Sequence, residues 1–278
     1  MVSQITGALV RAVLVMILIA IPSLMVPGVS SDTTQIVALV AIFAAGLTFF
    51  EYASTYPGLV EFRDAPPFNR LRYLSLLVTV VLLSTIVRDQ TQPTTLASFI
   101  GALGNKLGQS IDVPYSPVRL VVLMLPKDMS VDHIILVRTA AGIAYLISLL
   151  TLVVFVLAMR FIGWPNRMGT FNVWINLPTF DPTTGGDVVE RLTRDSRFNI
   201  ALGFLLPFII PVVVKLASLS LAPVTLESPH TLIWTMSAWA FLPASLFMRG
   251  IAMGRIAGMI ADKRKSLNQG SEHALQPA

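Results

Sequence analysis

Six apolar stretches recur along this chain, and each is long enough to cross a lipid bilayer as a helix. The hydrocarbon layer of a bilayer is about 30 Å thick, so a spanning helix needs roughly 20 apolar residues. Only 13% of the residues are charged, whereas an ordinary soluble domain carries about a quarter. The sequence therefore predicts an all-α, polytopic helical membrane protein, with about six transmembrane helices plus interfacial amphipathic helices.

The predicted spans are residues 8–26, 35–53, 71–87, 134–162, 199–221 and 231–249. Two long loops separate them, an outer loop (88–133) and an inner loop (163–198), within a single membrane domain over residues 1–265. Residues 266–278 are polar and are predicted to form a disordered tail. No basic residue precedes the first span, so we expect a retained helix rather than a removable signal peptide.

Lysine and arginine residues are distributed unequally between the two sides of the predicted bundle. Of the 20 Lys and Arg residues, 14 fall on the side that holds both termini and 6 on the opposite side. Because positive residues are retained in the cytoplasm, this bias predicts that both termini are cytoplasmic. The same bias explains the net charge of +5 without a nucleic-acid partner.

The outer loop contains an amphipathic stretch whose apolar residues share one helical stripe: Leu96, Phe99, Ile100, Leu103, Leu107 and Ile111. Residues 114–117 interrupt this stripe, and residues 118–125 form a second apolar run that is too short to span a bilayer. One interpretation is a helix in the membrane interface followed by a packed segment, which we expect. The alternative is a re-entrant pair that lines a cavity.

The inner loop is predicted to combine a cover with a surface helix. Residues 171–177 alternate apolar and polar side chains, which indicates either a short hairpin or an irregular cover. Residues 187–197 are predicted to form an amphipathic helix on the membrane surface. The predicted contacts to lipid phosphates lie on this helix and in the basic cluster near the C-terminus: Arg191, Arg194, Arg197, Lys263, Arg264 and Lys265.

Three glycines recur every fourth residue at the end of the sixth span, Gly250, Gly254 and Gly258. Each costs a helix roughly 1 kcal/mol relative to alanine. Such a row is typical of a helix face that another backbone approaches closely, and Ala240 and Ala244 form a similar pair within the span. We expect packing within the chain, with contact to a helix of another membrane protein as the second interpretation.

Two prolines, Pro207 and Pro211, interrupt the fifth span one turn apart. They indicate a hinge or, in a transporter, freed carbonyls that bind a cation. Lys215 follows one turn later and is expected to reach the outer surface, or to be a transport residue if it is held inside the bundle.

The fourth span begins with signals typical of a helix N-terminus. Ser130 can cap the helix, and the carboxylate of Asp132 complements its dipole. Arg138 follows about one turn into the span, and we expect it to pair with Asp132 or Glu227 near the same face. Arg138 is also a candidate transport residue because it is an ionisable group within a span.

The chain contains no residue pattern that identifies a reaction. It has no phosphate-binding glycine loop, no nucleophile-elbow serine and no metalloprotease helix. Cysteine is absent, which excludes disulfides and thiolate metal sites. The sequence therefore predicts no catalytic residue, no cofactor and no metal ligand.

Two loop sequences carry a resemblance to a known family. One begins Glu51-Tyr52-Ala53-Ser54-Thr55-Tyr56-Pro57 and continues to Arg72, and the other reads Phe171-Asn172-Val173-Trp174-Ile175-Asn176-Leu177-Pro178. Over most of its length the chain resembles an uncharacterised family of multi-pass inner-membrane proteins in alphaproteobacteria. The resemblance implies the bacterial inner (cytoplasmic) membrane and implies no activity.

Two functional hypotheses follow. The first is a non-catalytic subunit, organiser or assembly factor of a membrane complex, whose partners are the lipid bilayer and helices of other membrane proteins. Its contact surface would be the inner loops and the basic C-terminal helix. The second is a small-solute transporter or channel built around the proline-broken fifth span. The centres of the six spans are apolar, which counts against proton-coupled transport.

Overall fold

The computed structural model describes residues 2–165, 171–181, 183, 185–220 and 224–274. Every regular element in these ranges is a helix: α1 (Val2–Met25), α2 (Ser31–Ala53), α3 (Phe68–Asp89), α4 (Thr95–Ile111), α5 (Pro117–Met124), α6 (Val131–Ile162), α7 (Val173–Asn176), α8 (Val188–Ala217) and α9 (Pro229–Ala274). Among them α1, α2, α3, α6, α8 and α9 are long and apolar enough to cross a membrane. The chain is an all-α, polytopic membrane protein, as predicted.

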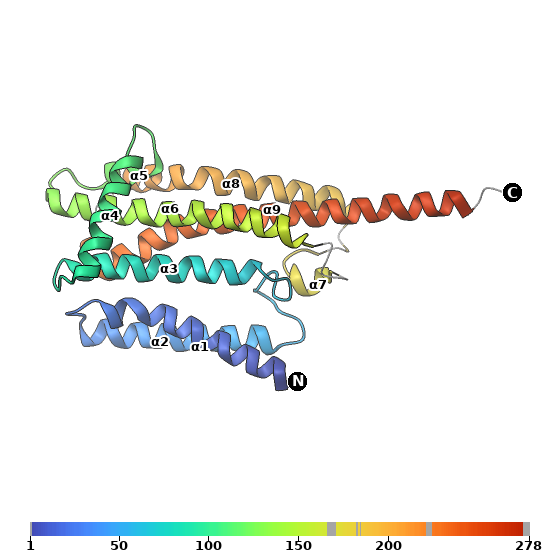
Figure 1. The fold of residues 1–278 in the computed structure, drawn as a ribbon, viewed down its shortest axis with the longest axis horizontal. Coiled ribbons are helices and arrows are strands. Elements are labelled where there is room, and N and C mark those ends of the chain that lie inside the picture. Colours follow the sequence, from blue (N-terminus) through green and yellow to red (C-terminus); the bar gives the residue numbers. More distant parts are fainter. Residues whose placement is uncertain (1, 166–170, 182, 184, 221–223, 275–278) are drawn as a thin grey trace.

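The six long helices run side by side along the long axis of the molecule (Figure 1). α1 begins and α9 leaves the bundle at the same end, which we call the basic end. At the opposite end α4 runs across α3 and α6, and we call this the α4 end. The two termini therefore point the same way, and their placement in the cytoplasm stays a prediction.

Four helix starts share the same capping chemistry. A hydroxyl side chain accepts a hydrogen bond from the backbone N–H three residues later, at distances of 3.1–3.3 Å, in Ser30, Thr94, Ser116 and Ser130. Such bonds satisfy one of the N–H groups that have no partner inside the helix. The prediction for Ser130 is confirmed. At its other end α6 stops at Gly163, whose left-handed backbone (φ 66°) favours glycine.

The interior of the bundle is built mainly by α3, α6 and α9, which contribute fully buried side chains such as Leu83, Val137 and Met236. α1 and α2 form a separate pair that meets the bundle through contacts of α1 with α3. α2 exposes large apolar side chains, among them Phe43 and Phe50. Lipid accounts for this exposure, because water would make such a surface costly.

Two predicted boundaries differ from the structure. The surface helix and the fifth span are one continuous helix, α8, in which Asn199 donates a hydrogen bond to the Asp195 carbonyl 2.7 Å away. α9 continues through residues 266–274, where a disordered tail was predicted. Neither place contains a proline, so the loss of apolar character does not end the helix, although residues 266–274 include Gly270.

The outer loop folds into α4 and α5. α4 approaches α6 so closely that a Cβ atom at Gly142 would lie 2.6 Å from the Gly108 Cα atom. The apolar stripe of α4 is divided: Leu96, Phe99, Leu103 and Leu107 are exposed, whereas Ile100 and Ile111 pack against the interior of the bundle. α5 buries Val121 and the rest of its inner face against α6 and α8. This arrangement fits the interfacial helix with a packed segment.

Candidate functional site at the basic end

The loop between α2 and α3 folds around one carboxylate at the basic end. Oε2 of Glu51 accepts hydrogen bonds from the backbone N–H groups of Gly58, Leu59 and Val60, at 3.0, 2.9 and 3.0 Å. Bonds from N–H groups to an ionised acceptor are about twice as strong as neutral ones. The loop therefore curls back onto the last turn of α2 and is held there.

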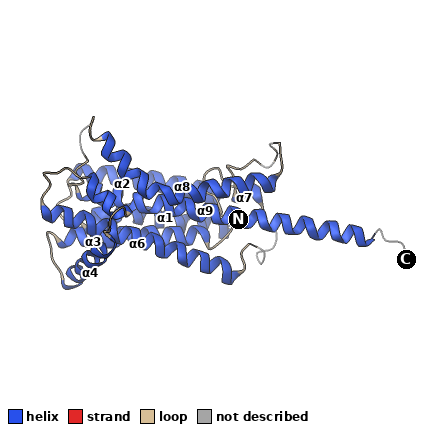
Figure 2. Ribbon diagram, turned by 90° about the horizontal axis from the view of Figure 1, so that it is seen from above, coloured by secondary structure: helices blue, strands red, loops and turns tan. Residues whose placement is uncertain are grey.

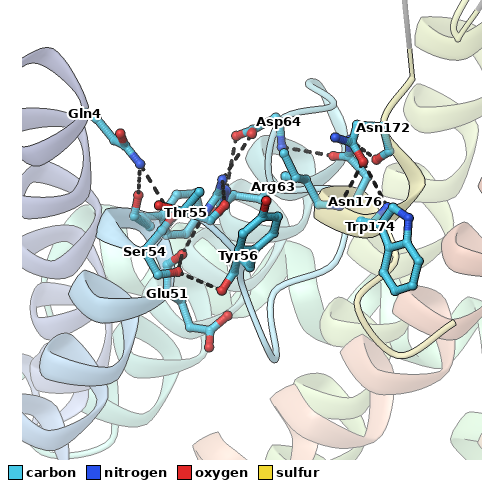
Figure 3. A network of polar contacts seen from close by, with 12 residues as sticks. Gln4, Glu51, Ser54, Thr55, Tyr56, Arg63, Asp64, Asn172, Trp174 and Asn176 are labelled. Carbon is cyan, nitrogen blue, oxygen red and sulfur yellow. Dashed lines mark hydrogen bonds and ion pairs between the residues drawn. The ribbon is translucent and has the colours of Figure 1, made fainter. Parts of the chain in front are cut away.

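Arg63 closes the same loop from the other side (Figure 3). Its Nη1 atom donates to the Ser54 carbonyl at 2.7 Å and to the Glu51 carbonyl at 3.1 Å, so it caps the C-terminus of α2. Its Nη2 atom pairs with the Asp64 carboxylate at 3.2 Å. A cation at a helix C-terminus is favourable because the helix dipole is negative there.

The α2–α3 loop is joined to the cover formed around α7. Asn176 is buried, and its Oδ1 atom accepts from the Asp64 N–H at 3.0 Å while its carbonyl accepts from the Phe62 N–H at 2.7 Å. Figure 3 shows Asp64 and Asn176 meeting across the two loops. Residues 171–177 are thus an irregular cover with one helical turn, and the alternative of a hairpin is wrong.

A three-part contact connects both loops to α9. The Arg249 guanidinium binds the Glu61 carboxylate through two atoms, at 2.6 and 2.8 Å, and the Thr179 hydroxyl donates to the same carboxylate at 2.7 Å. Both charged side chains are largely buried, with 12% of Glu61 and 26% of Arg249 exposed. Sequence analysis did not identify these residues, although an acid and an arginine flanking spans at one end were a usable signal.

The glycine row lies against α8 of the same chain. A Cβ atom at Gly250 would lie 2.7 Å from the Ser196 carbonyl oxygen, and one at Gly254 would lie 2.8 Å from the Ser196 hydroxyl. That hydroxyl donates to the Gly250 carbonyl at 2.7 Å. Gly258 has open space around it. The close approach therefore uses two of the three glycines, and Gly203 of α8, whose Cβ atom would lie 2.7 Å from the Pro243 carbonyl oxygen, extends it.

Within the span, Ala240 and Ala244 are buried in the interior of the bundle. Pro207 and Pro211 are also buried, and α8 continues through both. Because Pro211 has no N–H, the Pro207 carbonyl has no partner within the helix. The indole N–H of Trp239 donates to this carbonyl at 3.1 Å. The freed carbonyl is thus bound by a neighbouring helix rather than open to a cation.

Arg138 pairs with Asp112, not with either acid that the sequence suggested. Its Nη1 atom lies 3.8 Å from the Asp112 carboxylate, and its Nη2 atom donates to the Asn105 side chain at 3.2 Å. Nε of Arg119 lies 3.1 Å from the same carboxylate. The expected partners were wrong because α4 folds back across α6 and delivers its own C-terminal acid to Arg138.

Lys215 lies in the last turn of α8 at the α4 end. Its Nζ atom donates to the carbonyl of Leu125, the C-cap residue of α5, at 3.1 Å. A lysine ammonium near helix C-terminal carbonyls is favourable because it satisfies an acceptor and complements the dipole. Lys215 therefore fastens α5 to α8.

The predicted lipid-binding residues have different surroundings. The Arg191 guanidinium stacks on the Phe180 ring, 4.7 Å from its centroid. Arg194 and Arg197 are exposed and line a surface pocket of about 400 Å³, and Lys263 and Lys265 are exposed on α9. Arg264 instead binds Asp187, the N-cap residue of α8, at 2.5 Å, and this hydrogen bond holds the pKa of Asp187 below its usual value. Contact with lipid phosphates stays a prediction for all six residues.

The contacts described at this end join loops to helices. Among the described residues, no three His, Asp or Glu side chains form a group that could hold a metal ion. Comparison of the chain with protein-family models, with curated proteins and with solved structures finds no match.

Proposed function

We propose that this chain is a non-catalytic membrane protein that serves as a subunit, organiser or assembly factor of a membrane complex. The observation that carries the proposal is the distal part of α9, residues 265–274, which extends beyond the bundle as a single helix (Figures 1 and 2). Its residues include Asn268 and Gly270, which favour a helix weakly, so packing contacts would stabilise it. A partner at the basic end would supply those contacts.

The chemistry of this segment indicates the kind of partner. Lys265 and Leu267 are exposed on it, and Lys263 is exposed just before it, so α9 offers positive charge beside an apolar side chain. A helix or loop of another membrane protein that combines acidic and apolar residues would complement this surface. We infer a location in the bacterial inner membrane with the basic end in the cytoplasm, on the strength of the distribution of Lys and Arg.

Transport of a small solute is the alternative, and it finds less support. That hypothesis needs a polar path at the proline-broken part of α8. The carbonyl that Pro211 frees accepts a hydrogen bond from Trp239, as described above. A cation would have to displace the indole N–H before the carbonyl could bind it.

The test is site-specific photo-crosslinking in cells of the source organism. A photoreactive residue at Leu267 on the distal part of α9 is compared with one at Lys106, which is exposed at the α4 end. We expect a discrete protein adduct from Leu267, and we expect this adduct to be missing from Lys106. Removal of residues 266–278 should abolish co-purification of the same partner in mild detergent without lowering the unfolding temperature.

A chain that is recovered alone, with adducts only to lipid from both positions, would contradict the proposed function. So would an unchanged set of co-purifying proteins after the truncation. Uptake of a radiolabelled solute into vesicles that contain the purified chain, lost on Trp239→Ala, would favour the transport alternative.

A further inference from the structure

Arg11 is the single charged residue of α1, and it lies nine positions into an apolar helix. Its side chain is exposed rather than packed in the bundle. A guanidinium at this depth is costly in hydrocarbon, so long basic side chains extend toward the interface where phosphates and water are found. The direction and the contacts of the Arg11 side chain therefore indicate its role.

The guanidinium of Arg11 points toward the basic end and is fixed there. It stacks on the Tyr52 ring, 4.6 Å from the centroid, and its Nη1 atom donates to the Gly7 carbonyl at 2.7 Å. A Cβ atom at Gly7 would lie 2.9 Å from the same Nη1 atom. Glycine at this position thus leaves the space that the bent side chain occupies.

A pocket of about 470 Å³ opens beside this guanidinium. It lies where the first turns of α1 meet the last turn of α2, and its lining includes Ser3, Gln4, Arg11, Tyr52, Arg63 and Asp64. Two spanning helices begin or end here, so the pocket sits at the depth of the lipid head groups if α1 and α2 cross the bilayer.

Of the two arginines that line the pocket, only Arg63 is paired with a carboxylate among the residues that the structure describes. Arg63 is engaged by the Asp64 carboxylate and by carbonyls of α2, and the Gln4 amide donates to the Ala53 carbonyl at 3.2 Å. The negative end of α2 is therefore already capped (Figure 3). Within the described part of the chain, Arg11 forms no ion pair with a carboxylate, so its charge is available to an anion that enters the pocket.

We propose that this pocket binds a phosphate group, carried by an anionic phospholipid or by a soluble phosphate compound. Arg11 donates charge-assisted hydrogen bonds to the phosphate, while stacking on Tyr52 keeps the guanidinium in place. The side chains of Ser3 and Thr55, which also line the pocket, are suited to the remaining phosphate oxygens.

The proposal is tested on the purified full-length chain in neutral detergent, by native mass spectrometry during titration with phosphatidylglycerol. Arg11→Gln removes the charge, and Gly7→Ala pushes the guanidinium out of position. Arg70→Gln is the matched control for loss of one exposed arginine at the same end, and Gly46→Ala is the control for an added methyl group in open space. We expect Arg11→Gln and Gly7→Ala each to weaken binding by about tenfold or more, and the controls to bind like the parent.

Inorganic phosphate as a competitor distinguishes the two sources. Displacement of the lipid by phosphate assigns the pocket to a soluble compound, whereas retention of the lipid assigns it to a phospholipid head group; either result supports a phosphate site. An equal effect of Arg11→Gln and Arg70→Gln would overturn the proposal, because the binding would then follow net charge alone. Normal binding by the correctly folded Gly7→Ala protein would overturn the role given to the fixed guanidinium.

Discussion

Two contacts, one at each end of the bundle, differ in kind although each joins segments that are distant in the sequence. At the α4 end the backbones of α4 and α6 nearly touch at Gly108 and Gly142, and the contact depends on missing side chains. At the basic end the loops are joined to α9 through the ion pair of Glu61 and Arg249. The contact between Gly108 and Gly142 should therefore be sensitive to added volume, and the contact between Glu61 and Arg249 to lost charge.

The largest effect is expected from Gly142→Ala. The new Cβ atom would lie 2.6 Å from the Gly108 Cα atom, and a backbone cannot rotate away as a side chain can. We expect a loss of about 3 kcal/mol in the free energy of unfolding, measured by denaturation in mixed micelles. Gly46→Ala, with open space around the site, is the control. Equal stability of the two variants would show that α4 does not pack on α6 in this way.

Loss of charge at the basic end is tested by Glu61→Gln. The change leaves the largely buried Arg249 without a counter-charge, and we expect a loss of about 2 kcal/mol in the free energy of unfolding. The double variant with Arg249→Met should recover part of this loss, because the unpaired guanidinium is then removed. Additive losses in the double variant would mean that the two side chains are not coupled.

A smaller effect is expected midway between the ends. Trp239→Phe keeps an aromatic ring but leaves the Pro207 carbonyl without a donor, so we expect a loss of about 1 kcal/mol in the free energy of unfolding. Because the chain has no cysteine, single cysteines introduced at Lys106 and at Leu267 report on each end by their labelling rates. Those labelling rates should be unchanged by Trp239→Phe. A changed rate at either end would show that the effect of the substitution is not confined to the middle of the bundle.

The smallest effect is expected at acid pH, where the contact between Arg264 of α9 and Asp187 is weakened. The hydrogen bond from Arg264 lowers the pKa of Asp187, so the contact contributes fully above the usual pKa of an aspartate and is lost as the pH falls through the lowered value. We expect faster amide hydrogen exchange of residues 259–269 as the pH falls below the usual pKa of an aspartate and through the lowered value, after correction for the intrinsic rate. In Asp187→Asn this difference should already be present at pH 7. If Asp187→Asn leaves the pH dependence of the exchange rate unchanged, the faster exchange at acid pH comes from protonation of another acid.

Much of the architecture follows from local sequence signals. Hydrophobic length identifies the six spanning helices, because the bilayer imposes a length that a chain must satisfy residue by residue. The N-cap at Ser130 was likewise visible, since capping requires only a hydroxyl followed by the helix. The ends of α8 and α9 were less visible, because a helix that continues out of the membrane loses its apolar signal without losing its helical residues.

Contacts between distant segments could not be read in the same way. Glu61 and Arg249 are 188 residues apart, and nothing in either neighbourhood specifies the other. Arg138 had several acids within reach at one face, and only the return of α4 across α6 selects Asp112. Gly142 lies among other small residues of α6, and the sequence does not indicate which of them a second helix approaches. The position at which α4 crosses α6 selects Gly142.

The continuity of α9 has a mechanical consequence. Arg264 pairs with Asp187 at the start of α8, and ten further residues continue the helix to Ala274. At a rise of 1.5 Å per residue, these residues span about 15 Å, and the contacts of a bound partner would stiffen them. A partner bound at the end of α9 would then be held at a fixed distance from the bundle, whereas a flexible chain of the same length would allow that distance to vary.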